Sequence, residues 1–253
     1  MYIFIKKVFL LLISIMKKAI IVGASSGIGL ELARVLVRND YLVGITGRRK
    51  NLLEELKKEN PLKYFVKSFD IKDLSANEKN LNELVIELGG LDLLIISSGT
   101  GSVDADLCFE IEKEIIDTNV SGVTQIAIRG FNYFKKQNFG HLVVISSIAG
   151  LRGGRFVPSY GASKAFQINF LEGLRQKSRH DKLNVTITDI RPGFVDTAMA
   201  KSPLKFWVAP ASKAAHQIFK AIKKKKNVAY ITKRWVFIAY IMKLIPKWIW
   251  ERG

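Results

Sequence analysis

The sequence predicts an α/β fold, in which a parallel β-sheet carries helices on both faces. Three observations predict it. Seven short apolar segments recur along the chain, and several are apolar at almost every position, as expected for strands that are covered on both faces. Segments of helix length separate them, which is typical of strand–helix–strand units. The 253 residues contain no internal repeat and no Pro/Gly-rich linker, so we expect a single domain.

Seven strands make up the predicted sheet. They are 18–23, 41–47, 63–69, 91–97, 141–146, 184–190 and 227–232. The sheet and its helices are expected to form a domain over 17–232. An apolar extension, 1–16, precedes this domain, and a basic and aromatic tail, 233–253, follows it.

The composition excludes several classes of protein. Hydrophobic residues make up 48% of the chain and charged residues 25%, which excludes disordered chains, collagen and disulfide-rich scaffolds. Cys108 is the only cysteine, so the chain cannot form an internal disulfide and we expect a cytoplasmic location. No Cys and His residues stand at metal-ligand spacing, and we expect no bound metal.

The net charge of +18 is unusually positive and is concentrated in the last forty residues. A solvated surface, an anionic membrane and an acidic protein partner all stay open as explanations. The tail lacks a recognisable nucleic-acid-binding module, so we expect no nucleic-acid partner.

Each end of the chain allows two interpretations. The apolar run 8–16 is too short to span a bilayer, so either Met16 is the true initiator or the extension contacts a membrane. In the tail, Trp248, Lys243 and Lys247 border an apolar stretch. This stretch is either an interfacial helix on a membrane surface or a helix packed on the core or on a second subunit.

A glycine-rich turn after the first predicted strand indicates nucleotide binding. Gly23, Gly27 and Gly29 are spaced G-x-x-x-G-x-G, directly after a strand and at the start of a helix. Without side chains there, backbone amides can approach a pyrophosphate at the positive end of the helix. Ser25 and Ser26 add hydroxyl donors.

The residues that follow the second strand favour NADP(H) over NAD(H). Folds that bind NAD usually carry an acidic residue at this position, which would repel a 2′-phosphate. This chain has Arg48 and Arg49, and a guanidinium can hold a phosphate in a forked pair of charged hydrogen bonds. Asp70 follows the third strand and either contacts the adenine edge or caps the next helix.

Tyr160 and Lys164 stand four residues apart in a helical segment, so their side chains share one face. A free phenol has a pKa of about 10. We expect the ammonium, together with an oxidised nicotinamide, to lower this pKa and to make Tyr160 a proton donor or acceptor. Ser147, at a strand end, is placed to hold a substrate carbonyl oxygen, whereas its neighbour Ser146 should point to the opposite side. Asn119 is polar in an apolar helical pattern and needs a partner, such as a lysine-bound water.

Together these motifs resemble the short-chain dehydrogenase/reductase superfamily in its shorter-chain form. The resemblance spans 17–232 and rests on GASSGIG, on NVSG, on a serine thirteen residues before the tyrosine of YGASK, and on RPGFVDT. It implies a Rossmann fold and a catalytic tetrad, whose members are Asn119, Ser147, Tyr160 and Lys164. It also implies that Lys164 holds the nicotinamide ribose and that RPGFVDT bonds the carboxamide. By analogy with the family, we expect a homodimer or homotetramer.

The motifs and the resemblance together define the expected cofactor site. Its residues are Gly23, Ser25, Ser26, Gly27, Ile28, Gly29, Arg48, Arg49, Asp70, Ile71, Ser98, Gly99, Asn119, Tyr160, Lys164, Pro192, Gly193, Val195 and Thr197.

Two positions depart from the family pattern. Val22 replaces the threonine that commonly precedes the first glycine. The residues 96–99 read Ile-Ser-Ser-Gly where the family has Asn-Asn-Ala-Gly. This change removes an asparagine that ties strands together, so we expect a hydroxyl of Ser97 or Ser98 to substitute for it.

The expected function is the NADP(H)-dependent interconversion of a carbonyl group and a secondary alcohol. The tetrad handles only the carbonyl, so we expect substrate choice to depend on the segment 198–210, which follows RPGFVDT and which we call the lid. Its large apolar residues are Met199, Leu204, Phe206, Trp207 and Val208. This lid indicates either a lipophilic substrate or simple packing against the sheet. Two other functions stay open. One is a 3-oxoacyl-carrier-protein reductase that steers its partner with Arg129, Arg152 or Arg155, and the other is a catalytically idle NADP-binding scaffold at a membrane surface.

Overall fold

The computed structural model describes residues 16–102, 107–155, 158–198 and 206–252. Apart from Met16, the apolar extension predicted at the start therefore lies outside the described residues. The same holds for Met199 and Leu204 of the expected lid.

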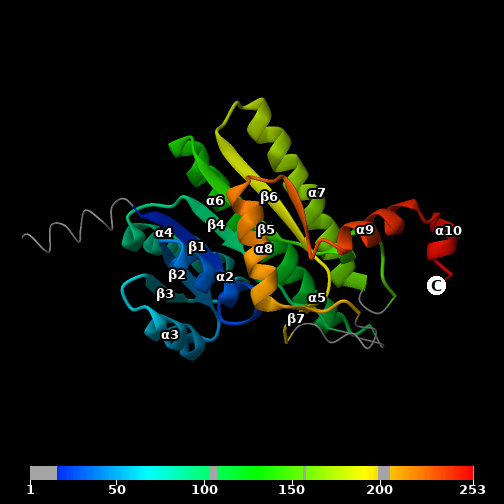
Figure 1. Ribbon diagram of the computed structural model, residues 1–253, viewed down its shortest axis with the longest axis horizontal. Coiled ribbons are helices and arrows are strands. Elements are labelled where there is room, and N and C mark those ends of the chain that lie inside the picture. The colour runs from blue at the N-terminus through cyan, green and yellow to red at the C-terminus, as the bar shows by residue number, and fades with distance from the viewer. Residues whose placement is uncertain (1–15, 103–106, 156–157, 199–205, 253) are drawn as a thin grey trace, which may run out of the picture.

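A seven-stranded parallel sheet runs through the molecule in the order β3-β2-β1-β4-β5-β6-β9 (Figure 1). Its strands are β1 (Lys17–Val22), β2 (Tyr41–Gly47), β3 (Tyr64–Ser68), β4 (Leu93–Ile96), β5 (Gly140–Ile145), β6 (Val185–Pro192) and β9 (Val228–Ile231). The prediction of a doubly wound, seven-stranded parallel sheet is confirmed. Strand order reverses between β1 and β4, and in such sheets a crevice opens at the carboxyl ends of the strands.

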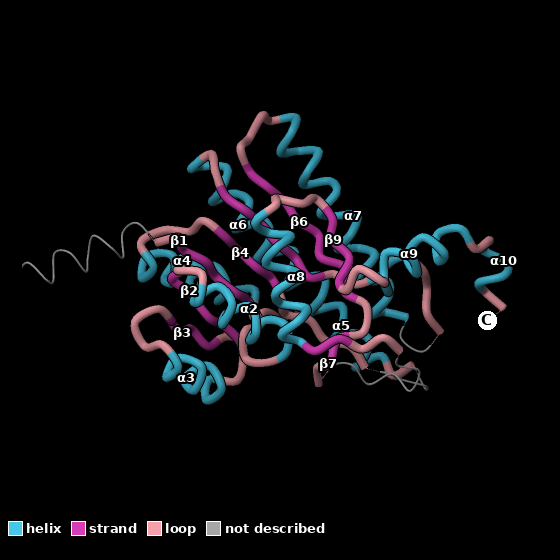
Figure 2. Tube along the Cα trace, viewed as in Figure 1, coloured by secondary structure: helices cyan, strands magenta, loops and turns pink. Residues whose placement is uncertain are grey.

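Helices cover both faces of the sheet (Figure 2). One face carries α2 (Gly27–Arg38), α3 (Lys50–Glu59) and α8 (Ala211–Lys223). The other carries α4 (Leu74–Leu88), α6 (Val123–Gln137) and α7 (Pro158–His180). Between β4 and α6 lie α5 (Phe109–Ile116) and a π-helical turn, η1 (Asp117–Gly122), and a 3-10 turn, η2 (Ile148–Leu151), follows β5.

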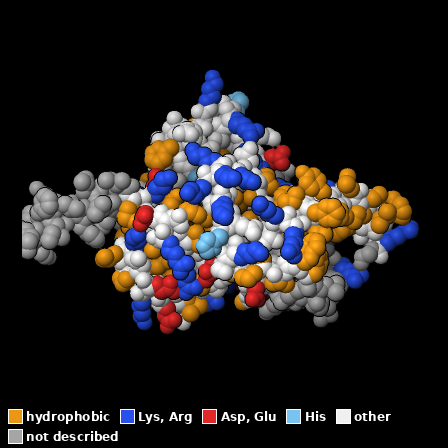
Figure 3. All heavy atoms as spheres, viewed as in Figure 1, with side chains coloured by type: hydrophobic (Ala, Val, Ile, Leu, Met, Phe, Trp, Pro, Cys, Tyr) orange, Lys and Arg blue, Asp and Glu red, His pale blue; other side chains and the backbone are white. Residues whose placement is uncertain are grey.

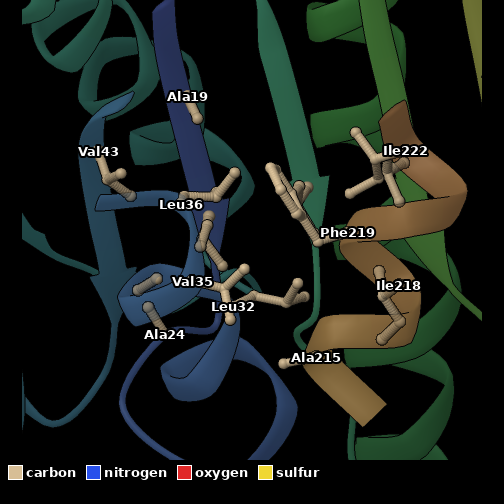
Figure 4. Close-up of a cluster of buried hydrophobic side chains, with 14 of the residues drawn as sticks. Ala19, Ala24, Leu32, Val35, Leu36, Val43, Ala215, Ile218, Phe219 and Ile222 are labelled. Atoms are coloured by element: carbon tan, nitrogen blue, oxygen red, sulfur yellow. The ribbon is translucent and has the colours of Figure 1, made fainter. Parts of the chain in front are cut away.

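Alternate residues of each strand point to opposite faces of the sheet and contribute to two hydrophobic cores. In β1, Ala19 and Ile21 face one layer of helices, and Ile20 and Val22 face the other. All four side chains are at most 1% exposed. Over the first face, side chains of α2 and α8 meet in a single cluster beside β1 (Figure 4). Because helices cover both faces of the sheet, we expect a ligand to bind at the carboxyl ends of the strands.

A small second sheet holds the ends of the expected lid together. Its strands are β7 (Val195–Asp196) and β8 (Ala209–Pro210), which pair in parallel. The N–H of Ala209 also donates to the carbonyl oxygen of Phe194 at 3.0 Å. Residues 194–196 and 209–210 are therefore held side by side.

Two short helices, α9 (Trp235–Leu244) and α10 (Lys247–Trp250), project from the body at the C-terminal end (Figure 1). On α9 only Trp235 and Ala239 are buried, each 1% exposed. None of the helices in the described ranges is long and apolar enough to cross a membrane.

Candidate active site

A cavity of about 490 Å³ lies at the carboxyl edge of the sheet, between the loops that follow β1, β2, β3, β4, β5 and β6. Its walls include most of the residues predicted for cofactor binding and catalysis. These are Gly23, Ser25, Ser26, Gly27, Ile28, Arg48, Arg49, Asp70, Ile71, Ser98, Gly99, Ser147, Tyr160, Lys164, Pro192, Gly193, Val195 and Thr197. The two remaining predicted residues, Gly29 and Asn119, are buried and do not line the cavity.

The glycine-rich turn has a shape that side chains would destroy. Gly23 and Gly27 adopt positive φ angles of 94° and 57°, a region that favours glycine. A Cβ on Gly29 would lie 2.0 Å from the carbonyl oxygen of Gly23, so α2 packs directly on the turn. A Cβ on Gly27 would lie 3.0 Å from the methyl carbon of Thr197. The turn therefore fits a group that approaches the backbone closely, such as a pyrophosphate.

The two arginines that follow β2 have different surroundings. The guanidinium of Arg49 donates to the hydroxyl oxygens of Ser25 at 2.8 Å and Ser26 at 2.6 Å, so it lies over the glycine-rich turn. The side chain of Arg48 is 58% exposed, and its ion pairs with Asp70 and Glu114 are long, at 3.7 and 3.6 Å. Both arginines are exposed, and the guanidinium of Arg48, which has only long ion pairs, is the less engaged of the two for a phosphate that arrives from solvent.

Asp70 lies in the cavity wall and does not cap the next helix. Its carboxylate accepts the N–H of Lys72 at 3.0 Å, within its own turn. The cap of α4 is Asp73, whose carboxylate accepts the N–H of Ala76 at 3.1 Å. The capping alternative for Asp70 was therefore wrong, because the helix begins three residues later than that alternative requires. Its contact with the adenine edge stays a prediction.

Ser147, Tyr160 and Lys164 meet at the cavity from two elements. Ser147 follows β5, and its hydroxyl forms a hydrogen bond with the hydroxyl of Tyr160 on α7. The Ser147 oxygen also accepts the N–H of Ala149 at 3.1 Å, which fixes it at the start of η2. The Nζ of Lys164 lies 5.8 Å from the centre of the Tyr160 ring. Ser146 points elsewhere and donates to the Asp189 carboxylate and, at 3.1 Å, to the carbonyl oxygen of Ile190.

The protein without a cofactor raises the pKa of Tyr160, so the lowering expected with an oxidised nicotinamide stays a prediction. Burial raises this pKa, and the hydrogen bond with Ser147 offsets part of the rise. Burial also lowers the pKa of Lys164 to about 8, although the charge of Asp189 opposes this shift. The ammonium donates to the carbonyl oxygen of Ile145 at 3.0 Å instead of to the phenol. Burial, which depends on the tertiary structure, is therefore the largest influence on the Tyr160 pKa in the protein alone.

Asn119 connects the loop after β4 to the π-helical turn. Its side chain is fully buried, and its amide nitrogen donates to the carbonyl oxygen of Thr100 at 2.8 Å and to the hydroxyl of Ser163 at 3.0 Å. Its amide oxygen accepts the N–H of Thr100 at 2.9 Å. Sequence reasoning missed both partners, because the pairing of Thr100 with Asn119 exists only once the chain has folded.

Backbone amides of Ser97 and Ser98 join the end of β4 to β1. The N–H groups of Ser97 and Ser98 both donate to the carbonyl oxygen of Val22 at 2.8 Å. This joins the end of β4 to the end of β1, next to the glycine-rich turn. These are main-chain bonds that do not depend on the side chain, so the substitution of a serine hydroxyl for the family asparagine stays a prediction.

Sequence motifs also missed Gln167 and Gly101. The buried side chain of Gln167 accepts from the Nζ of Lys164 at 3.1 Å and donates to the carbonyl oxygen of Asn119 at 2.7 Å. Its position three residues after Lys164 on α7 is the only signal that pointed to it. A Cβ on Gly101 would lie 2.7 Å from the Tyr160 ring, so the loop after β4 passes directly against this ring.

An aromatic cluster joins the described end of the lid to the tail. The ring of Trp235 lies 5.5 Å from that of Phe194, 5.0 Å from that of Phe206 and 6.2 Å from that of Trp207, measured between ring centres. Phe194 also lines the cavity. Phe206, Trp207 and Val208 remain 40–46% exposed. This part of the lid therefore packs on Trp235 of α9, while the side chains of Phe206, Trp207 and Val208 stay partly exposed to solvent.

Two of the arginines considered for steering a carrier protein have other partners. Arg129 forms an ion pair with Glu78 at 2.6 Å. Arg152 donates to the carbonyl oxygens of Met242 at 2.8 Å and Ile245 at 2.6 Å, at the C-terminal end of α9. These contacts give the carrier hypothesis no support.

Comparison with known proteins identifies the family. A family model described as short chain dehydrogenase matches residues 17–205. An uncharacterized oxidoreductase of Myxococcus xanthus is 35% identical over 203 residues, which cover 75% of this chain and 78% of that protein. A second uncharacterized oxidoreductase, from Mycobacterium tuberculosis, is 30% identical over 241 residues, which cover 91% and 94%. A solved structure, the closed form of serine dehydrogenase complexed with NADP+, superposes with a TM-score of 0.78 at 25% identity and covers 85% and 94% of the two chains. The chain belongs to the short-chain dehydrogenase family of oxidoreductases.

Proposed function

We propose that the protein interconverts a carbonyl group and a secondary alcohol, with NADP(H) as its cofactor. The observation that carries this proposal is the meeting of Ser147, Tyr160 and Lys164 on the cavity that also contains the glycine-rich turn. Hydroxyl, phenol and ammonium groups at one site suit acid–base chemistry on an oxygen atom. When bound, the cofactor supplies or accepts a hydride.

The cofactor is held by the glycine-rich turn and by Arg48. The open backbone between Gly23 and Gly29 suits the pyrophosphate, and the exposed guanidinium of Arg48 suits a 2′-phosphate. Lys164 holds the nicotinamide ribose, and residues 192–197 pass beside the nicotinamide. The complex of serine dehydrogenase with NADP+ supports NADP(H) over NAD(H).

Each residue of the tetrad has a distinct part in the reaction. The Ser147 hydroxyl donates to the substrate carbonyl oxygen and orients it. The Tyr160 phenol gives its proton to that oxygen as the alcohol forms. A phenol with an ordinary pKa of about 10 is protonated at neutral pH and can give this proton, and oxidation uses the same groups in reverse. Lys164 holds positive charge beside the phenol, and Asn119 orders the surrounding loop and the path for proton resupply.

We also propose a lipophilic substrate, a cytoplasmic location and a homodimer or homotetramer. The ring of Phe194, which lines the cavity, and the rings of Phe206 and Trp207, which belong to the same aromatic cluster, support a lipophilic substrate. The single, exposed cysteine supports a reducing compartment. The assembly rests on family analogy alone.

The test is the oxidation of NADPH by the purified protein over a panel of lipophilic ketones and aldehydes. Tyr160→Phe should reduce turnover by about 10²–10⁴-fold, because it removes only the acidic hydroxyl. Tyr133→Phe, on α6, is the matched control and should keep native turnover. If both variants bind NADPH but neither they nor the native protein turn over any panel compound, the idle-scaffold function replaces this one. Turnover restricted to carrier-bound 3-ketones would instead support the carrier-protein reductase.

A further inference from the structure

The outer side of α9 and α10 exposes large apolar side chains to solvent. We call this surface the tail face. Its residues are Phe237, Tyr240, Ile241, Leu244, Trp248 and Ile249, and they are 38–79% exposed. In Figure 3 these helices form an orange area at the end of the molecule, with blue side chains at its border. A contiguous apolar surface of this kind marks an interaction site in a soluble domain.

The tail face is a fixed feature of the fold. Nine of the ten residues of α9 are uncharged, Lys243 being the exception, and only Trp235 and Ala239 of this helix are fully buried. A helix that is apolar all round is ordinarily buried in a core or in lipid. The far end of α9 is held by the guanidinium of Arg152, and the indole N–H of Trp250 donates to the carbonyl oxygen of Gly153 at 2.8 Å. These bonds hold the apolar side outward.

Cations surround the tail face. Between residues 233 and 253 the chain has five basic residues and one acid, Glu251. The basic residues are Lys233, Arg234, Lys243, Lys247 and Arg252. The guanidinium of Arg252 lies 5.5 Å from the centre of the exposed Trp248 ring. Aromatic and apolar groups bordered by cations suit the boundary between lipid headgroups and acyl chains, and each cation near an anionic membrane adds to binding.

The same charges argue against a second copy of this chain as the partner. A two-fold dimer through the tail face would bring each patch of cations close to its own copy. Anionic lipid headgroups neutralise these cations instead. We propose that the tail face lies on the surface of an anionic lipid bilayer, with its apolar side chains at the acyl boundary and its cations among the headgroups.

This docking does not depend on the proposed function, but it would serve it. Trp235 begins α9 and packs on Phe194, which lines the cavity. A bilayer that contacts the tail face is therefore separated from the cavity by the aromatic cluster around Trp235. If the proposed reaction is correct, the substrate class narrows to carbonyl compounds that partition into lipid; this step alone rests on the proposed function.

The test is sedimentation of the full-length protein with vesicles of neutral phosphatidylcholine and with vesicles that also contain phosphatidylglycerol. The native protein should bind the mixed vesicles more strongly, and added salt should weaken this binding. The double variant Phe237→Glu, Leu244→Glu should lower the partition coefficient by at least about tenfold, because it places acids in the apolar contact. Ile86→Glu is the matched control, because Ile86 is also highly exposed, at 78%, but lies on α4. It should bind as the native protein does.

A second variant and an assembly measurement complete the test. Lys243→Gln with Lys247→Gln removes two cations and should lower binding to the mixed vesicles by about fivefold for each charge. Circular dichroism of every variant checks that it is folded. Equal vesicle binding by the native protein and the tail variants, or no native binding to either vesicle, would overturn the proposal. So would a native dimer that the Phe237→Glu, Leu244→Glu variant converts to monomers, because a second copy would then be the partner.

Discussion

Gln167 accepts a hydrogen bond from the ammonium of Lys164 at 3.1 Å, within a part of α7 that solvent hardly reaches. The same side chain donates to the main-chain carbonyl of Asn119 at 2.7 Å. Since burial already lowers the pKa of Lys164 to about 8, each acceptor near its Nζ helps to keep the group charged. Gln167 is therefore a positioning residue that acts through Lys164.

Replacing Gln167 should move the alkaline limb of the pH–rate profile. Gln167→Leu removes one of the two described acceptors of the Lys164 ammonium, so the pKa of Lys164 falls and activity is lost at lower pH than in the native protein. Gln167→Glu adds a negative charge and should shift this limb to higher pH. We expect kcat at neutral pH to fall about tenfold in the leucine variant, as for the loss of a buried charged hydrogen bond. A purely structural role would lower stability in both variants and leave the limb unmoved.

Cofactor preference should depend on Arg48. Arg48→Ala should raise the Kd of NADPH by about 10- to 100-fold, since it removes charge-assisted bonds to the 2′-phosphate, and should leave the Kd of NADH nearly unchanged. Fluorescence titration of both cofactors measures this. Arg49→Ala is the comparison: its guanidinium bonds to Ser25 and Ser26, so this variant should weaken both cofactors alike. Equal weakening of both cofactors by Arg48→Ala would assign the 2′-phosphate to another group.

The close contact between Gly193 and Trp235 should make the protein less stable when residue 193 carries a side chain. A Cβ on Gly193 would lie 2.0 Å from the indole ring, which is fully buried, so Gly193→Ala should lower the free energy of unfolding by about 1–3 kcal/mol. Gly173→Ala offers the opposite case, because a Cβ there meets nothing within 4 Å on the exposed side of α7. It should raise the free energy of unfolding by about 0.5–1 kcal/mol. Thermal melts of the two variants that shift in the same direction would contradict the packing described at Gly193.

Buried His141 should make the protein sensitive to acid. Burial and the charge of Lys225 lower its pKa from 6.5 to about 4, and its Nε2 lies 2.7 Å from the hydroxyl of Thr188. Between these two pH values the unfolded chain binds a proton that the folded protein does not, so stability falls as the pH drops through this range. The loss reaches about 3 kcal/mol when the range is complete.

His141→Gln tests this acid sensitivity. Denaturant titrations across the range should show the native protein losing more free energy of unfolding than the variant does. Because other carboxylates titrate in both proteins, the quantity that matters is the difference between the two curves. Parallel curves would mean that His141 is already protonated in the folded protein.

The strands and the glycine-rich turn were predictable from sequence because their signals are local. Each strand is a short apolar run, and the turn needs glycine for its own backbone geometry. The family motifs also placed Ser147, Tyr160 and Lys164, which the structure brings to one cavity.

The remaining features depend on contacts between distant parts of the chain. No local pattern shows that the N–H of Thr100 meets Asn119, or that Arg152 reaches the end of the tail helix. The burial of Tyr160, which raises its pKa in the protein without a cofactor, is a further feature of this kind. Spacing shows that a lysine is near, whereas the extent of burial follows only from the folded structure.

A single-turnover experiment tests the central claim most directly. The native protein and Tyr160→Phe are each mixed, in excess over NADPH, with the most reactive ketone of the panel, and the alcohol formed is measured after quenching. We predict one alcohol for each NADPH with the native protein. Tyr160→Phe should form almost none in the same time, although it still binds NADPH. Alcohol formation by Tyr160→Phe at the native rate would show that the phenol does not supply the proton, and would contradict the proposed mechanism.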